Sequence, residues 1–253
     1  MTQATIRLTT AQALVQWLAS QFTQIEGSRV PLFPGVFGIF GHGNVSCLSE
    51  ALESVQDRLP TWRGQHEQSM ALAATGFAKA KRRRQLMVAA ASIGPGALNM
   101  VTAAGVAHAN RLPLLLLAGD TFANRLSDPV LQQVEHFGNP TVTVNDAFRP
   151  VTRYWDRIMH PAQILPSLPQ ATAIMLDPAD CGPAFISLPQ DVQEIAFDYP
   201  VRFFEEKIWT IPRPRPDRDA LAQAADRLKA AKKPLLIAGG GVRYSLAEEA
   251  VAA

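Results

Sequence analysis

Gly64-Gln65-His66-Glu67-Gln68 and Ser92-Ile93-Gly94-Pro95-Gly96-Ala97-Leu98-Asn99 are the two stretches that decide the fold. The first opens an Ala-rich helix predicted over 67–80, which places the Glu67 carboxyl group at a helix N-terminus. The second follows the apolar stretch 86–91, which lacks polar alternation, as is typical of a strand covered on both faces. A Gly-Pro-Gly turn lets backbone approach a ligand without interference from a Cβ atom. The two stretches predict an acidic side chain beside a tight turn at the carboxyl end of a strand.

The rest of the chain alternates short apolar stretches with amphipathic ones, which predicts an α/β fold with a parallel sheet flanked by helices. We expect strands at 36–40, 61–63, 86–91, 114–119, 183–189 and, as an aromatic strand or connecting turn, 151–158. We expect helices at 11–18, 46–55, 67–80, 97–109, 131–137 and 162–175. This first domain is predicted to cover 1–200.

A Pro-rich stretch at 211–216 cannot continue a helix or a strand, so we predict a linker over 201–216. Beyond it, a helix at 219–229, a strand at 234–241 running into Gly239-Gly240-Gly241 and a helix from 246 indicate the start of a second domain over 217–253. The Gly triplet lacks the G-x-G-x-x-G spacing and the later acidic residue of a dinucleotide site. We therefore expect no bound nucleotide there, with a bound nucleotide as the alternative.

Composition excludes several classes of function. The chain has 253 residues, 47% of them hydrophobic, and a net charge of +2, which is too small to indicate nucleic acid or an anionic membrane as partner. The basic run 79–84 is expected to close the helix before it, where cations complement the helix dipole, with a phosphate-binding patch as the alternative. Cys47 and Cys181 are expected to be reduced packing residues. With neither a signal-peptide pattern nor a long apolar span, the protein is expected to be cytoplasmic.

The order of the motifs resembles that of the thiamine diphosphate (ThDP) enzymes, among them acetohydroxyacid synthase and pyruvate oxidase. The resemblance implies a pyrimidine-binding domain in which Glu67 is catalytic and also binds the cofactor, pressing its carboxyl group against the pyrimidine ring. Such a Glu must hold a proton at working pH, which the apolar residues after it favour. Read without this context, Glu67 is an ordinary first-turn Glu favoured by the helix dipole.

The same resemblance assigns cofactor-binding roles to Gly94, Pro95, Gly96 and Asn99, the last bracing the turn through its side chain. Gln132 or Gln133 corresponds to a Gln that related enzymes direct towards the cofactor, in a register that the sequence leaves open. His42 follows the first strand, where relatives approach the reactive carbon. It is a candidate catalytic residue that binds a polyhydroxylated substrate or moves a proton, or else a residue that caps the next helix or lies exposed.

Four further segments resemble the trihydroxycyclohexane-dione hydrolases of myo-inositol catabolism, and they lie at 6–14, 39–45, 127–135 and 150–158. This resemblance implies a ThDP- and Mg²⁺-dependent hydrolase that opens a cyclic 1,2-dione by C–C cleavage to a deoxy-glucuronic acid. The alternatives are another ThDP chemistry, such as acetohydroxyacid synthase-like carboligation or decarboxylation, and a non-catalytic truncated assembly partner.

ThDP enzymes hold Mg²⁺ and the diphosphate on a further domain that has a Gly-Asp-Gly start and a downstream Asn. No such segment occurs in this sequence. We therefore expect the metal to be held by a domain absent from this chain, and the chain alone to bind ThDP poorly and to catalyse nothing. We also expect 217–253 to begin a Rossmann-like central domain. Because related sites form between subunits, a homo-oligomer, either a dimer or a tetramer, is also expected.

Overall fold

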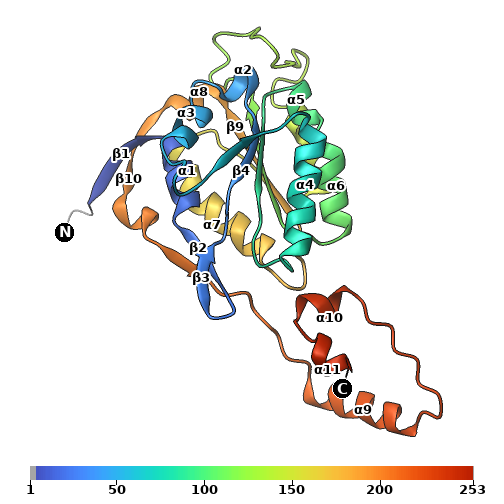
Figure 1. Cartoon of the computed structure of the whole chain (residues 1–253). Helices are drawn as coiled ribbons and strands as arrows, with labels where there is room; N and C mark the ends of the chain where they lie inside the picture. Colours follow the sequence, from blue (N-terminus) through green and yellow to red (C-terminus); the bar gives the residue numbers. More distant parts are fainter. Residues whose placement is uncertain (1–3, 253) are drawn as a thin grey trace. The chain divides into compact units, whose positions relative to one another are not determined.

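The computed structural model describes residues 4–252 and divides the chain into two compact units, Met1–Thr210 and Ile211–Ala253. At the centre of the first unit is a six-stranded parallel sheet with the strand order β5-β4-β6-β7-β9-β8 (Figure 1). Its strands are β4 (Val36–Ile39), β5 (Thr61–Arg63), β6 (Val88–Ala91), β7 (Leu114–Asp120), β8 (Tyr154–Arg157) and β9 (Pro183–Pro189). The predicted parallel α/β sheet is confirmed.

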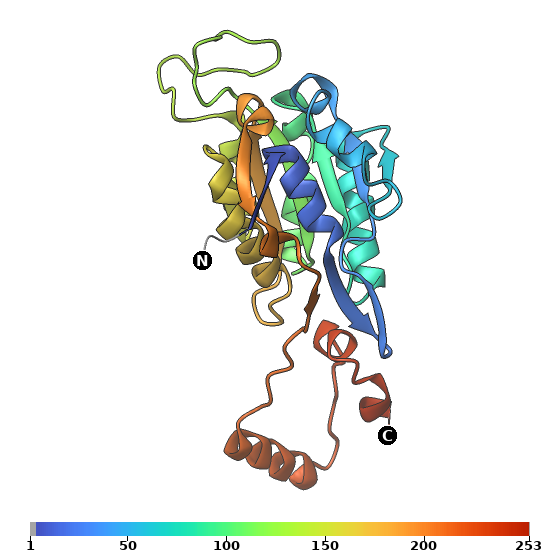
Figure 2. The same ribbon diagram turned by 90° about the vertical axis from the view of Figure 1, so that its left-hand side faces the viewer.

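Helices cover both faces of this sheet (Figures 1 and 2). One face carries α4 (Glu67–Ala80) and α6 (Val101–Ala109), and the other carries α1 (Thr10–Ala19), α3 (Leu48–Glu53) and α7 (Ile164–Met175). Strands β7 and β9 lie in the middle of these layers and are buried along their whole length. Burial on both faces explains why their sequences are continuous apolar runs.

Two smaller sheets flank the central one, and neither was predicted. Strand β1 (Thr5–Thr9) pairs antiparallel with β10 (Ala196–Pro200), and β2 (Gln21–Ile25) lies between β3 (Ser28–Pro31) and β11 (Lys207–Trp209). Because β11 pairs with β2, the first unit reaches Thr210 rather than ending at residue 200. The first part of the predicted 201–216 linker is therefore ordered within this unit.

Most predicted helices are present, with changes at their ends. The 46–55 helix is confined to α3, and the 97–109 helix is divided into α5 (Pro95–Leu98) and α6. The segment directly after β4, which contains His42, is a helical turn, α2 (Gly41–Asn44). The remaining short elements are η1 (Val144–Val151), η2 (Pro161–Gln163), α8 (Gln190–Glu194) and η3 (Val201–Phe204).

The predicted helix at 131–137 is wrong. Gln132 and Val134 have φ of 66° and 54°, in the left-handed region that a right-handed helix cannot include. The segment instead belongs to an extended loop, residues 121–143, that connects β7 to η1 at the carboxyl edge of the sheet (Figure 1).

The second unit contains α9 (Arg218–Ala230), α10 (Gly240–Tyr244) and α11 (Glu248–Ala252). Helix α9 begins at the N-cap Asp217, whose carboxylate accepts bonds from the backbone N–H groups of Asp219 and Ala220. The strand predicted at 234–241 is wrong, because this segment forms no strand and Leu235 and Ile237 are 84% and 88% exposed. A strand needs a neighbour to take its backbone hydrogen bonds, and the described part of this unit contains none. Within residues 4–252 no helix is long and apolar enough to cross a bilayer.

Candidate functional site

At the carboxyl ends of the neighbouring strands β4 and β6, the connections to the next strands leave in opposite directions along the sheet. The connection from β4 leads to β5 at one edge of the sheet, while that from β6 leads to β7 on the other side. In open α/β sheets, ligands bind in the crevice outside such a switch point. Helix α2 follows β4, and the Gly94–Gly96 turn follows β6, so these two segments border the crevice.

Glycines of α2 lie close to the side chains that begin the turn. A Cβ atom added to Gly41 would lie 2.5 Å from Ser92 Oγ, and one added to Gly43 would lie 2.9 Å from Ile93 Cβ. The Gly43 N–H donates to Ser92 Oγ at 3.5 Å. His42 lies between these glycines and is half-buried. The structure therefore places His42 at the same sheet edge as the turn, but within the described residues no hydrogen bond joins it to Glu67.

Glu67 is the first residue of α4, and its carboxylate faces the turn. Asn99 Nδ2 donates to Glu67 Oε2 at 2.9 Å. A Cβ atom added to Gly96 would lie 3.5 Å from Glu67 Oε1, so the glycine keeps space open beside that oxygen. The sequence separates Glu67 from Asn99 by a helix and a strand, and the structure brings them into contact. Asn99 braces Glu67 with its side chain, whereas its backbone N–H bonds to the turn.

Gly94 is the tightest position of the turn. Its φ is 62°, and an added Cβ atom would lie 2.1 Å from the Gln132 carbonyl oxygen and 3.1 Å from Val134 Cγ2. Gly94 is buried and Pro95 is exposed. The 121–143 loop thus lies directly against the turn, and the main chain of Gln132, not its side chain, makes the approach.

Gln132 and its neighbour Gln133 have different surroundings. Gln132 is exposed, whereas Gln133 is 0% exposed and its Oε1 accepts a bond from the Phe122 N–H at 3.1 Å. Gln133 Nε2 is buried without a partner among the described residues. Gln133 therefore supports the loop from inside. The cofactor-directed role assigned to Gln132 stays a prediction, as do the roles of the other predicted site residues.

Sequence reasoning missed Gln193 of α8, which joins α2 to the end of β9. Its Nε2 donates to Gly43 O at 3.1 Å, to Asn44 Oδ1 at 3.0 Å and to Leu188 O at 3.0 Å. Asn44 Nδ2 in turn donates to Ala91 O at 2.5 Å. These contacts tie α2 to the ends of β6 and β9. A Gln one helix after the last strand carries no sequence signal of such a role.

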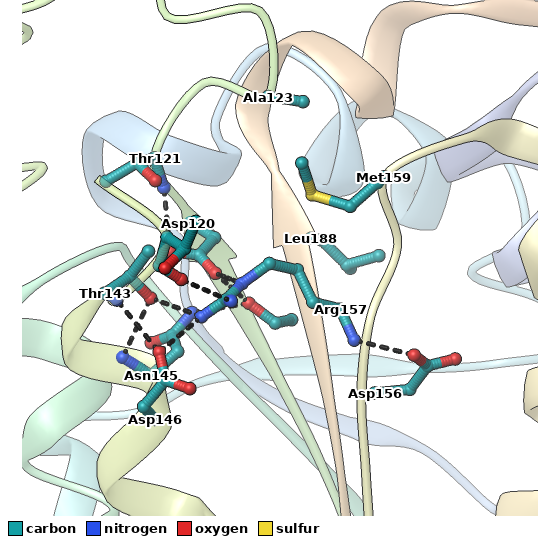
Figure 3. A network of polar contacts seen from close by, with 12 residues as sticks. Asp120, Thr121, Ala123, Thr143, Asn145, Asp146, Asp156, Arg157, Met159 and Leu188 are labelled. Carbon is teal, nitrogen blue, oxygen red and sulfur yellow. Dashed lines mark hydrogen bonds and ion pairs between the residues drawn. The ribbon is translucent and has the colours of Figure 1, made fainter. Parts of the chain in front are cut away.

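A second missed group is the buried polar network around Arg157, the last residue of β8 (Figure 3). Arg157 Nε donates to Asp120 Oδ2 at 2.7 Å, and an Arg157 terminal nitrogen donates to Asp146 Oδ2 at 2.7 Å. Ser187 Oγ also donates to Asp120, and Asn145 Nδ2 donates to Ser187 Oγ at 2.8 Å. Asp120 ends β7 and Arg157 ends β8, and β9 lies between these two strands. Opposite charges at the ends of two predicted parallel strands are the only sequence signal of the pair.

Burial and charge act against each other in this network. Burial raises the pKa of Asp146, but bonds from the Thr143 N–H and from the guanidinium groups of Arg157 and Arg149 outweigh it and lower that pKa below its ordinary value. Burial lowers the pKa of Arg157, but the charges of Asp120 and Asp146 and their hydrogen bonds raise it overall. Asp146 and Arg157 therefore both remain charged at neutral pH.

The two cysteines show no sign of activation. Burial raises the pKa of Cys47 to about 11 and that of Cys181 to about 12. In residues 4–252 no three side chains of His, Cys, Asp or Glu come close enough together to hold a metal ion. The sequence assigns the metal to a domain outside this chain, and that assignment stays a prediction.

Comparison with known proteins identifies the fold. Residues 34–139 match the family described as thiamine pyrophosphate enzyme, N-terminal TPP binding domain. This span contains every predicted site residue, from His42 to Gln132. The chain therefore carries the TPP-binding domain of the thiamine pyrophosphate enzymes.

Relatives extend the similarity over almost the whole chain. The chain is 49% identical over 247 residues to the 3D-(3,5/4)-trihydroxycyclohexane-1,2-dione hydrolase of Geobacillus thermodenitrificans, covering 98% of this chain and 39% of that protein. It is 47% identical over 249 residues to the hydrolase of the same name from Listeria monocytogenes, covering 98% and 39%. The chain thus spans well under half the length of these relatives and is similar to their N-terminal portion.

Proposed function

Proceeding from a chain that carries the TPP-binding domain of thiamine pyrophosphate enzymes, we propose that it supplies the pyrimidine-activating part of a ThDP-dependent hydrolase. Its substrate is a 3D-(3,5/4)-trihydroxycyclohexane-1,2-dione, which is opened by C–C cleavage to a deoxy-glucuronic acid. The relatives' names support the substrate. The observation that carries the proposal is the Glu67 carboxylate, held by Asn99 at 2.9 Å beside the glycines of the turn.

The residues at the crevice fit the pyrimidine end of ThDP. Gly96 leaves the space beside Glu67 Oε1 open, a space that any larger side chain would fill. Helix α5, which begins at Pro95, and helix α4 both lack a side-chain N-cap, so their first backbone N–H groups have no intrahelical partner. We assign the pyrimidine ring to Glu67 and to the main chain of 94–96. ThDP would supply the carbanion chemistry when bound, since that chemistry belongs to the cofactor.

The work of the chain's own residues is to orient and to hold a proton. Glu67 presents its carboxyl group for proton transfer next to the turn, and Asn99 fixes the orientation of that group by donating to Oε2. His42, at the same edge on α2, binds a hydroxyl group of the polyhydroxylated substrate or moves a proton. Mg²⁺ and the diphosphate are assigned to the part of the relatives that this chain does not span, and catalysis requires that part.

The test is Glu67→Gln in a chimera in which this chain replaces the matching portion of the Geobacillus thermodenitrificans relative. Gln keeps the size of Glu and cannot relay the proton, so hydrogen–deuterium exchange at the reactive carbon of bound ThDP should slow by about 10² to 10⁴. Glu50→Gln is the matched control, because Glu50 is also a first-turn Glu, of α3, and lies outside the crevice. If the Glu67→Gln chimera exchanges at the rate of the unmodified chimera, Glu67 is not the activating residue.

The substrate is tested on the same unmodified chimera. Turnover of the cyclic dione, with none of pyruvate, supports the proposal. Carboligation or decarboxylation of pyruvate without dione opening would instead assign acetohydroxyacid synthase-like chemistry. A chimera that assembles and binds ThDP but turns over neither compound would favour a non-catalytic assembly role.

We also propose that the protein is a homo-oligomer. Apolar side chains are exposed close to the crevice, and these are Leu98 (39%), Leu131 (68%), Val134 (50%) and Phe137 (75%). Exposed apolar groups of this kind mark contact surfaces. Light scattering should give a dimer or a larger species, and a monodisperse monomer at micromolar concentration would contradict this.

A further inference from the structure

The 121–143 loop is anchored by polar contacts at both of its stems, and one guanidinium group connects the two anchors. We propose that Arg157 is a positioning residue that locks both stems of this loop and thereby holds the main chain of Gln132 against Gly94. The consequence for ThDP binding rests on the proposed function, whereas the locking of the loop is independent of it.

The outgoing stem is fixed residue by residue by side chains. The Thr121 N–H donates to Asp120 Oδ1 at 2.8 Å, and the Phe122 N–H donates to Gln133 Oε1 at 3.1 Å. The N–H groups of Ala123 and Asn124 donate to the two oxygens of Asp191, at 2.9 and 3.1 Å. Four consecutive backbone N–H groups thus bond to carboxylate or amide oxygens, and the first of these acceptors is Asp120.

The returning stem is fixed by Arg157. Its guanidinium group donates to Thr141 O at 3.3 Å, to Thr143 Oγ1 at 2.8 Å and to Asp146 Oδ2 at 2.7 Å. Its Nε bonds to Asp120 on the outgoing side (Figure 3). Arg157 therefore connects the last residue of β7 to the residues that end the loop.

Apolar burial does not hold the outer part of the loop, where Gln133 is the buried residue and it is polar. Leu126 is 92% exposed, Leu131 is 68% exposed and Phe137 is 75% exposed. An exposed loop with few buried apolar contacts takes its position from its stems. The contact between Gln132 and Gly94 lies between the two stems, so it depends on both of them being held.

Arg149 provides a matched comparison. It also bonds to Asp146, at 2.6 Å, and its guanidinium carbon lies 3.7 Å from the centre of the Trp155 ring. It is more exposed than Arg157, with side-chain exposures of 55% and 14%, and it bonds to neither Asp120 nor Thr143. Lys in place of Arg157 keeps the charge but lacks the fork that reaches several acceptors at once.

The experiment is hydrogen exchange followed by mass spectrometry on the full 253-residue chain without ligand. The variants are R157K, R149K and the double variant R157M/D120N. The double variant replaces R157K if R157K does not fold, because it leaves no buried Asp120 carboxylate without its partner. Amides of 121–143 should exchange about tenfold faster or more in R157K and in R157M/D120N, while those of β7 and β9 keep their protection. R149K should match the unmodified chain.

Two outcomes overturn the proposal. One is unchanged exchange of 121–143 in both Arg157 variants, and the other is faster exchange spread equally over the sheet, which indicates general destabilisation. In the chimera, R157K should raise the apparent KM for ThDP several-fold with kcat little changed. If the loop loosens in R157K but that KM does not change, Arg157 still holds the loop, and its effect on ThDP binding is contradicted. Failure of this inference is thereby distinguished from failure of the proposed function.

Discussion

Gly94→Ala combines two separable penalties. Gly94 has φ of 62° and ψ of −120°, a region that is essentially restricted to Gly and costs an L-residue about 1–3 kcal/mol. The added Cβ atom would also lie 2.1 Å from the Gln132 carbonyl oxygen, so the loop main chain must move. We expect the free energy of unfolding of the first unit to fall by about 2–4 kcal/mol.

Two other glycines separate the two penalties. Gly27 has φ of 79° with no atom within 4 Å of an added Cβ, so Gly27→Ala carries the backbone penalty alone, about 1–2 kcal/mol. Gly76 lies in the interior of α4, also in open space, and Gly76→Ala should stabilise the protein by about 0.5–1 kcal/mol because Gly is a poor helix former.

The assay is urea unfolding followed by tryptophan fluorescence and circular dichroism, with the midpoints compared at constant slope. The expected order of stability is Gly76→Ala, unmodified chain, Gly27→Ala and Gly94→Ala, from highest to lowest. If Gly94→Ala unfolds within about 0.5 kcal/mol of the unmodified chain, the close approach of the loop to the turn is refuted. Equal losses in Gly94→Ala and Gly27→Ala would show that the loop contact adds nothing to the backbone penalty.

Three further predictions concern other parts of the chain. The pKa of Asp146 is lowered from an ordinary value of 3.8, so the stabilising effect of its carboxylate is present above that pH and is lost as pH falls through the lowered value. Asp146→Asn should therefore lose less stability on acidification than the unmodified chain. Parallel losses of the two proteins would contradict this. With the pKa of Cys47 raised to about 11, its thiolate fraction at neutral pH is about 10² below that of a free thiol. Iodoacetamide should therefore alkylate Cys47 slowly. Alkylation as fast as that of glutathione would show that the pKa of Cys47 is not raised. Thr9→Ala should cost about 1 kcal/mol, because Thr9 and Gln12 form a capping box at α1, whereas Thr9→Ser should cost little; equal urea midpoints for the two variants would count against the cap.

Local patterns in the sequence were enough to predict the central sheet, the helix that begins at Glu67 and the Gly-Pro-Gly turn. Apolar runs at β7 and β9 reflect burial on both faces, and the helix beginning at Glu67 follows from its Ala-rich composition, so these elements occur where they were predicted. The Gly-Pro-Gly turn could be identified because glycine and proline constrain the backbone on their own. The resemblance of the motif order to the ThDP enzymes then indicated the cofactor.

Long-range pairing could not be read from such patterns. Strands β1 and β10 are polar and exposed at many positions, and they form only because segments from the two ends of the first unit meet. The helix expected at 131–137 fails because Gln132 and Val134 have left-handed φ, in a segment whose main chain lies against Gly94. The segment 234–241 has the composition of a strand, but a strand also requires a neighbour.

The candidate site also combines features set by local sequence with features set by tertiary contacts. Residue type and spacing were enough to place Glu67 at a helix start and the glycine turn after a strand, because helix starts and tight turns are local. Only the tertiary structure brings Asn99 to Glu67, Gln133 to Phe122 and Arg157 to Asp120. The first and last of these contacts join side chains from different elements, whereas Gln133 Oε1 accepts from a backbone N–H in the same loop. Each depends on how the chain folds back on itself, which no short stretch of sequence encodes.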